Sequence, residues 1–258
     1  MKLYFKFSVF IAIQPFLYVA TLKINDLTTF EFCLSRLFIT LFVAVFQEYK
    51  FINMSNINLQ CLLGIQCNDF VMIAADQTNS HSIMVMKDDE EKIYKISDKL
   101  VMGVVGDSGD TTQFAEYIAK NIQLYKMRNG YELGPTAAAN FTRRNLAEYL
   151  RSSSPYFVNI LMGGYDKENG PELYFMDYLA SSIKVPFAAH GFGGYLSLSV
   201  MDRYYKKDLT EKEAYEILQK CVQEVHKRLF VSLPNFQVTV VKREGIEVLP
   251  VINSSSLK

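Results

Sequence analysis

One acidic side chain stands at the end of an uninterrupted apolar stretch. Residues 70–75 are all apolar, and Asp76 follows them directly. Such a run is typical of a strand that is covered on both faces. A carboxylate at the end of a dry strand is costly unless a cation or hydrogen-bond donors meet it. Asp76 is therefore the first candidate for a charged residue of the functional site, and the rest of the chain must supply its partner.

The thiols and imidazoles do not have the spacing of metal ligands. No pair of cysteines is separated as in CxxC, and the histidines form no cluster with them. These residues are Cys33, Cys61, Cys67, Cys221, His81, His190 and His226. We expect no metal site and no cofactor. Buried, reduced thiols are the simplest interpretation, and they fit a reducing compartment.

A glycine-rich segment at residues 186–194 is expected to form a turn that leads into a helix over 195–205. Backbone amides at the start of a helix can hold an anion. The segment lacks the Lys-Ser/Thr pair of a P-loop and the GxGxxG spacing of dinucleotide sites. Close backbone packing is therefore its expected role.

The composition of the chain argues against a nucleic-acid-binding protein. The 258 residues carry 27 Lys and Arg against 27 Asp and Glu, and half are apolar. A neutral chain without a basic stripe does not indicate a nucleic-acid partner. The length allows one large domain or two small ones. The many aromatic and Met residues fit a permanent assembly, although the same residues also fill cores.

The order of the expected elements suggests two layers of sheet. Strands are expected around a tight turn at Asn68-Asp69, then over 92–96 and 100–105. Two helices follow, one ending at Asn129-Gly130 and one beginning at Pro135. Strands return at 157–162 and 172–176 with a loop over 163–171, then the helix over 195–205, a helix with a capping box at Thr210–Glu213, and strands at 236–241 and 245–251. Two facing sheets with a helix pair on each outer face are the economical arrangement.

The beginning of the chain differs from the rest. Residues 7–20 form a largely apolar run after two lysines, which resembles a signal peptide, but a proline interrupts the run and no small-residue cleavage site follows. A second apolar run at 37–46 is too short to span a bilayer comfortably. A targeting segment and an extension foreign to the mature protein both remain open. We expect residues 1–53 to be an apolar extension and the domain to occupy 54–258.

Several motifs resemble a known family. They are residues 71–76 (VMIAAD), 92–96 (KIYKI), 163–166 (GGYD), 170–174 (GPELY) and 188–191 (AAHG). From about Cys61 onward the chain resembles proteasome β subunits, which have the N-terminal nucleophile hydrolase fold. Longer runs at 113–118, 123–133 and 135–146 are similar to the subunit at the β4 position of the ring. The resemblance implies an α+β domain, a four-layer αββα sandwich seated in a seven-membered β ring of the 20S core.

The resemblance also implies where a catalytic site would lie. Active members use an N-terminal Thr, freed by self-cleavage after Gly, whose α-amino group is the base. A carboxylate follows about sixteen residues later and a lysine about sixteen beyond it, which lowers the pKa of the hydroxyl. Asp76 and Lys92 match those two positions, but Gln60 stands where the nucleophile would be. The sequence contains no Gly-Thr dipeptide.

Two further positions depart from the family pattern. Phe192 stands in place of a serine in the glycine turn, and Leu229 replaces the aspartate of an Arg-Asp-x-x-Ser element that keeps Ser232. We therefore expect no catalytic residue. Gln60, Asp76, Lys92 and Ser232 are interpreted as vestigial site positions, in which Asp76 and Lys92 form a structural ion pair.

One alternative remains an active hydrolase that uses Cys61, exposed by cleavage after Gln60. Cys61 is one residue out of register, and alternation along a strand would point its thiol away from Lys92. A secreted or membrane-tethered protein is a second alternative, and it depends on the opening apolar run alone.

Without catalysis, the expected function lies in interfaces. The resemblance implies β3 and β5 neighbours in the same ring, α subunits of the adjacent ring and the opposite β ring, with no nucleic acid and no membrane. It also implies a location in cytoplasm and nucleus. Candidate contact residues, each of which could equally be a core or solvated side chain, are Arg143, Arg144, Tyr125, Tyr131 and Tyr149.

Overall fold

The computed structural model describes residues 59–81 and 84–253. The expected extension at 1–53 and the expected start of the domain at Met54 lie outside the described residues.

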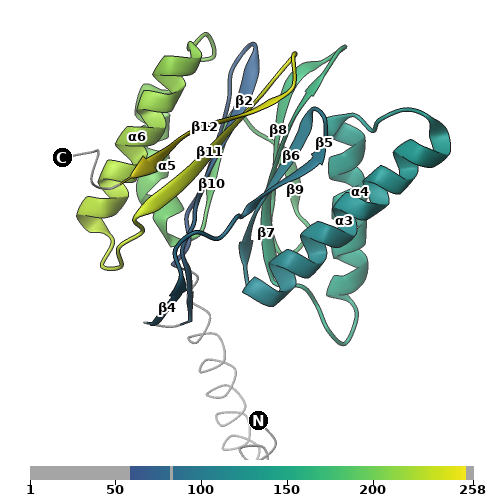
Figure 1. Cartoon of the computed structure of the whole chain (residues 1–258), viewed down its shortest axis with the longest axis horizontal. Helices are drawn as coiled ribbons and strands as arrows, with labels where there is room; N and C mark the ends of the chain where they lie inside the picture. Colours follow the sequence, from purple (N-terminus) through teal and green to yellow (C-terminus); the bar gives the residue numbers. More distant parts are fainter. Residues whose placement is uncertain (1–58, 82–83, 254–258) are drawn as a thin grey trace, which may run out of the picture. The chain divides into compact units, whose positions relative to one another are not determined.

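Two five-stranded antiparallel sheets face each other (Figure 1). The first has the order β10 (Phe187–His190), β1 (Leu62–Gln66), β2 (Phe70–Asp76), β11 (Asn235–Lys242), β12 (Ile246–Asn253). The second has the order β5 (Ile93–Ser97), β6 (Leu100–Gly106), β7 (Val158–Asp166), β8 (Gly170–Met176), β9 (Ser182–Lys184). A separate two-stranded ribbon consists of β3 (Asn79–His81) and β4 (Met84–Lys87).

A pair of helices covers the outer face of each sheet (Figure 1). The helices are α3 (Ser108–Asn129) and α4 (Pro135–Leu150) on the second sheet, and α5 (Phe192–Tyr204) and α6 (Glu211–Arg228) on the first. Their ends follow the local signals, because Gly130 adopts a left-handed conformation after α3 and Thr210 forms a capping box with Glu213 before α6. The expected four-layer αββα sandwich is confirmed.

β2 is buried on both faces, as its sequence predicts. Met72 and Ala74 belong to the core shared with α5 and α6, whereas Val71 and Ile73 belong to the core between the two sheets. A third core lies between the second sheet and the helices α3 and α4. Since side chains alternate along a strand, an all-apolar run is what a strand in an inner layer requires.

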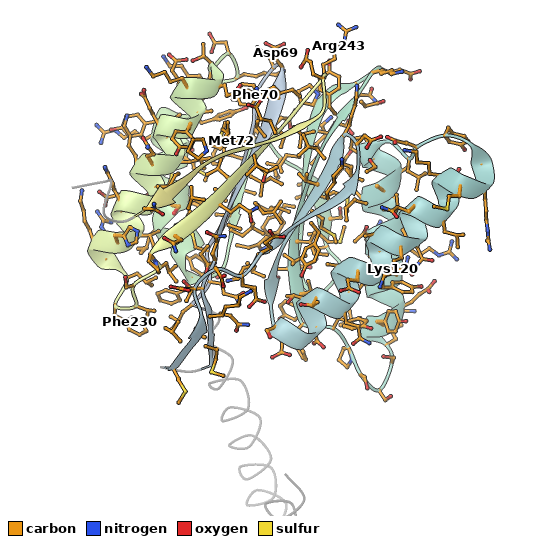
Figure 2. All side chains as sticks on the ribbon, in the orientation of Figure 1. Asp69, Phe70, Met72, Lys120, Phe230 and Arg243 are labelled. Carbon is orange, nitrogen blue, oxygen red and sulfur yellow. The ribbon has the colours of Figure 1, made fainter. Side chains whose placement is uncertain are left out.

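The end of β2 lies at one end of the sandwich. The turns that hold Asp69 and Arg243 lie at the opposite end (Figure 2). β1 begins with Leu62, which pairs with Ala75, the residue before Asp76. The start of β1 and the end of β2 are therefore neighbours, and the backbone before β1 is brought to the Asp76 carboxylate.

The prediction of a loop over 163–171 is wrong. β7 and β8 extend into this stretch and leave a turn of only three residues, 167–169. Gly163 lies within β7, at a position where the facing sheet leaves no room for a side chain. A Cβ atom there would lie 2.8 Å from the side chain of Val71 and 3.1 Å from that of Ile73. Here glycine marks close packing of two sheets rather than a turn.

The turn expected over 186–194 is also largely wrong. Residues 187–190 of this stretch are β10, which pairs with β1, and α5 begins at Phe192 rather than at Tyr195. The change of direction is confined to Gly191, which has a φ of 79°. A Cβ atom on Gly191 would lie 2.1 Å from the carbonyl oxygen of Gln60. Close backbone packing, the role expected for this segment, is confirmed at this residue.

Candidate functional site

Asp76 and Lys92 form a buried ion pair. Lys92 Nζ donates to Asp76 Oδ2 over 2.8 Å and to the carbonyl oxygen of Thr78 over 2.7 Å. Asp76 is fully buried and Lys92 is 6% exposed. The expected pairing is therefore present, although sequence reasoning missed the third group, the Thr78 carbonyl. A backbone acceptor leaves no residue-specific signal in a sequence.

Backbone amides complete the shell of the carboxylate. The N–H of Cys61 donates to Asp76 Oδ1 over 2.7 Å, and the N–H of Thr78 donates to Oδ2 over 3.2 Å. Burial raises the pKa of Asp76, while Lys92 and the two amides oppose this rise by favouring the ionised carboxylate. Both carboxylate oxygens are thus engaged within the fold.

Gln60 is attached to the backbone of Gly106 by two hydrogen bonds. The N–H of Gly106 donates to Gln60 Oε1 over 2.9 Å, and Gln60 Nε2 donates to the carbonyl oxygen of Gly106 over 3.3 Å. Gly106 ends β6 two residues before α3 begins. A backbone N–H in this place could stabilise negative charge on a group bound beside residue 60. In this chain the carboxamide of Gln60 already occupies it.

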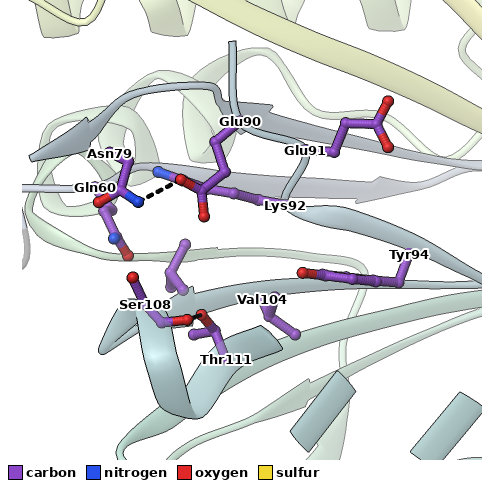
Figure 3. Close-up of a pocket in the computed structure, with 10 residues that line it drawn as sticks. Gln60, Asn79, Glu90, Glu91, Lys92, Tyr94, Val104, Ser108 and Thr111 are labelled. Carbon is purple, nitrogen blue, oxygen red and sulfur yellow. Dashed lines mark hydrogen bonds between the residues drawn. The ribbon is translucent and has the colours of Figure 1, made fainter. Parts of the chain in front are cut away.

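Gln60 and Lys92 line one small cavity (Figure 3). Asn79 Nδ2 donates to a carboxylate oxygen of Glu90 at its edge, and the side chain of Thr111 lies on the opposite wall. The cavity volume is about 10 Å³, which is room for about one water molecule.

Cys61 presents its thiol to a different part of the core. Its side chain is fully buried in the cluster shared with α5 and α6. A Cβ atom at Gly193 would lie 2.7 Å from Cys61 Sγ, so the start of α5 packs directly on the sulfur. Burial is the main reason why the pKa of this thiol is raised well above its usual value. The predicted orientation, away from Lys92, agrees with this packing.

The remaining predicted position does not join the cluster. Ser232 is exposed in the segment between α6 and β11. Within the described residues, no hydrogen bond connects it with Asp76 or Lys92. Leu229 is buried and apolar, and Phe192 is half exposed. The structure therefore brings together three of the four positions and leaves Ser232 outside.

No metal-binding arrangement is found in the described part of the chain, in which no three His, Cys, Asp or Glu side chains could hold an ion together. The thiols of Cys61, Cys67 and Cys221 are free and buried. Burial raises the pKa of both Cys67 and Cys221 to about 12. Over the same ranges, 59–81 and 84–253, no helix is long and apolar enough to span a bilayer.

The candidate contact residues lie on α3, on α4 and in the connection between them. Tyr125 and Tyr131 share a hydrogen bond through their hydroxyl groups, and Tyr149 packs edge-on against neighbouring tyrosines. Arg143 Nε donates to a carbonyl of the β8–β9 turn over 3.3 Å, and Arg144 pairs with a glutamate one helical turn further on. Each of these side chains thus makes at least one contact within the subunit.

An αββα sandwich in which a buried carboxylate and lysine lie beside the start of β1 defines the class as the N-terminal nucleophile hydrolase fold. The sequence profile of the family described as Proteasome subunit matches residues 58–241. The chain belongs to the proteasome subunit family.

Similar proteins identify the branch of the family. The chain is 46% identical over 187 residues to proteasome subunit beta type-2-A of Arabidopsis thaliana, which covers 72% of this chain and 91% of the relative. It is 42% identical over 189 residues to proteasome subunit beta type-4 of Saccharomyces cerevisiae, and the aligned stretch covers 73% of this chain and 96% of that relative. A probable proteasome subunit beta type-4 of Schizosaccharomyces pombe is 44% identical over 189 residues, which cover 73% of this chain and 97% of that relative. The chain is a β subunit similar to those named type 2 and type 4.

Proposed function

We propose that this chain is a non-catalytic β subunit of the 20S proteasome core, which takes part in ubiquitin-dependent proteolysis by building the β ring. The observation that carries the proposal is Gln60. Its carboxamide stands where active relatives of this fold need a nucleophile. Both the oxygen and the nitrogen of the carboxamide form hydrogen bonds with the backbone of Gly106. A carboxamide offers no hydroxyl or thiol with which to attack a peptide bond.

The surroundings of Gln60 support the same proposal. The adjoining cavity has room for about one water molecule. The charges of Asp76 and Lys92 are satisfied by each other and by backbone groups. The same two residues that would tune a nucleophile in an active relative thus stabilise the fold here.

The alternative of a hydrolase that uses Cys61 receives no such support. Its thiol is fully buried against α5, and its amide nitrogen donates to Asp76. Cleavage after Gln60 would turn that amide into a charged amine without moving the sulfur out of the core. A buried thiol with a raised pKa is a poor nucleophile.

The proposed partners follow from membership of the family and from the similarity to type-2 and type-4 subunits. We place the chain at the β4 position, between β3 and β5 neighbours, beneath α subunits and against the opposite β ring. The proposed location is cytoplasm and nucleus. The proposed subunit domain is 54–258, a range that contains the matched stretch at 58–241.

A tagged copy of the chain tests this proposal. It should sediment with 20S particles and recover α and β subunits in equal molar amounts. Recovery of the tagged chain only as a free protein, or with other partners, would contradict the assignment. Equal amounts of each subunit are the expected result because a ring position is filled once in each ring.

A further inference from the structure

Two Asn-Gly dipeptides lie on the surface of the domain, at Asn129-Gly130 and Asn169-Gly170. This dipeptide is prone to deamidation, because glycine has no side chain to shield its backbone nitrogen from the carboxamide before it. Both asparagines are exposed, and the two glycines have φ values of 76° and 75°. A Cβ atom on either glycine would meet nothing within 4 Å. Sequence and steric access therefore predict equal reactivity, and hydrogen bonding must decide between the two.

The last turn of α3 holds both reacting groups of the first dipeptide. Asn129 is the final residue of this helix. The N–H of Gly130 donates to the carbonyl oxygen of Lys126 over 2.8 Å, and Asn129 Nδ2 donates to the carbonyl oxygen of Tyr125 over 2.9 Å. The nitrogen that would attack and the amine that would leave are thus both bound to the helix backbone. Deamidation at Asn129 requires this turn to open.

Side chains around the end of α3 oppose that opening. Lys126 pairs with Glu132 in the connection to α4 and lies 3.4 Å from Asp98 in the β5–β6 turn. The hydroxyl groups of Tyr125 and Tyr131 share a hydrogen bond. Each of these exposed contacts is weak by itself, but together they join the last helical turn to segments on both sides of it.

The turn between β7 and β8 holds the second dipeptide less firmly. Asn169 lies in the turn 167–169, outside both strands, and Gly170 is the first residue of β8. Asn169 Nδ2 donates to Asp166 Oδ2 over 3.1 Å, so the acceptor is a half-buried side chain rather than helix backbone. Among the ion pairs of the described residues, none includes a residue of this turn. A short surface turn with few restraints opens more readily than a tied helix end.

We propose that Asn169 is the deamidation site of the folded chain, and that the end of α3 protects Asn129. The backbone nitrogen of Gly170 loses its proton to hydroxide and attacks Cγ of Asn169. A bond forms between that nitrogen and Cγ, the bond from Cγ to Nδ2 breaks, and the amine leaves as ammonia with a proton from water. Water then opens the succinimide ring at either carbonyl, which gives aspartate or isoaspartate. This inference does not depend on the proposed function.

Either product changes the turn. The carboxamide that donates to Asp166 becomes a second carboxylate beside it, and like charges repel each other. Isoaspartate also adds a methylene group to the backbone next to the pair formed by Asp166 and Gly170. Isoaspartyl groups are the substrate class of protein carboxyl methyltransferases that use S-adenosylmethionine, so the aged turn is a site for such an enzyme.

Ageing of the full chain tests the assignment. The tagged chain is purified from cells without denaturant and incubated at mildly alkaline pH, beside a second sample in guanidinium chloride. Trypsin places Asn129 and Asn169 on different peptides, and mass spectrometry measures the conversion of each amide to an acid. In guanidinium chloride the two rates should be similar. In the native sample Asn129 should react more slowly than Asn169 by roughly tenfold or more, because its helical turn must open first.

Two results of this experiment would overturn the inference. One is a pair of native rates that differ no more than the rates in guanidinium chloride, or that favour Asn129. The other is a native Asn169 that stays intact over a time that converts it fully in guanidinium chloride.

The same substitution at the two positions provides a matched second test. Aged native samples are treated with an isoaspartyl carboxyl methyltransferase and labelled S-adenosylmethionine. Asn169→Gln should remove most of the label, because glutamine does not form the five-membered ring readily, whereas Asn129→Gln should leave the label nearly unchanged. Label that is lost in Asn129→Gln and kept in Asn169→Gln would contradict the inference. Thermal unfolding of both variants checks that each is folded, and the rates of the wild-type chain decide the question if one is not.

Discussion

The side chain of Gln60 and the backbone of Gly106 exchange two hydrogen bonds, one in each direction. This relationship joins the segment before β1 to the end of β6, and therefore joins the two sheets at the end where Asp76 and Lys92 meet. A group that could have stabilised charge in a reaction instead holds a carboxamide. In this chain the two groups form a structural contact between distant segments.

Gln60→Ala should remove both hydrogen bonds and leave the Gly106 amide without its side-chain partner. We expect a loss of about 1–2 kcal/mol in the free energy of unfolding, measured by denaturant titration of the purified chain. Peptidase activities of particles that carry the variant should equal those of wild-type particles. Gln123→Ala, on the exposed face of α3, is the control and should change neither quantity. A fall in any peptidase activity at equal particle concentration would contradict a purely structural Gln60.

Asp76→Ala should leave Lys92 and two backbone amides without their buried acceptor. Breaking a buried ion pair at one partner costs about 3–5 kcal/mol. The variant should therefore unfold at a lower temperature and enter particles in lower yield, with no change in specific peptidase activity.

Combining Asp76→Ala with Lys92→Met tests the cause of that loss. Without the stranded ammonium group, the double variant should be more stable than Asp76→Ala alone. Glu148→Ala, which breaks an exposed pair with Arg144, should have little effect. A melting temperature unchanged by Asp76→Ala would show that the pair does not support the fold.

His190 should make stability depend on pH. It is buried, stacks on Phe175 with ring centroids 4.1 Å apart, and its Nε2–H donates to the carbonyl oxygen of Ile160 over 3.1 Å. Burial lowers the pKa of His190 from 6.5 to about 4. Below pH 6.5 the imidazole of the unfolded chain binds a proton, whereas that of the folded chain binds one only near pH 4. The contribution of neutral His190 to the free energy of unfolding is therefore fully present above pH 6.5 and is lost as the pH falls toward 4.

The expected contribution of His190 to this loss is up to about 3 kcal/mol. Denaturant titrations of wild type and His190→Gln at pH 7.5 and pH 4.5 would measure it, because the glutamine has no proton to gain. The loss between the two pH values should be smaller for the variant. Equal losses would mean that His190 titrates alike in the folded and unfolded states.

The sequence was informative where a pattern has one physical solution. The all-apolar β2 required a covered strand, and the structure covers it on both faces. The capping box at Thr210 marked the start of α6 correctly. Asp76 predicted a buried partner, and the family register identified Lys92 as that partner.

Other features depend on contacts between distant segments. The sequence predicts a loop at Gly163, whereas the structure places it in β7, where the facing side chain of Val71 requires a glycine. The bonds of Gln60 connect residues 46 positions apart, and one partner is a backbone group with no side chain to reveal it. The family pattern predicts Ser232 near Asp76, but Ser232 is exposed in the segment after α6. These outcomes depend on tertiary packing rather than on local sequence.

Cys61 should be chemically inert in the folded chain. Its thiol is buried and its pKa is raised, and thiolate formation controls alkylation. Treatment of native particles with iodoacetamide should leave Cys61 unmodified, and treatment after denaturation in guanidinium chloride should modify it. Peptide mass spectrometry would measure both states. Rapid modification of Cys61 in native particles would support the alternative hydrolase.

The most direct test of the central claim is covalent labelling by an epoxyketone, which forms an adduct with an N-terminal nucleophile and its α-amino group. Purified 20S particles that contain this chain are treated with the inhibitor, and the intact mass of every subunit is measured before and after treatment. We predict that subunits with an N-terminal Thr gain the mass of the inhibitor while the mass of this chain stays the same. An adduct on this chain at residue 60 or 61 would contradict the account.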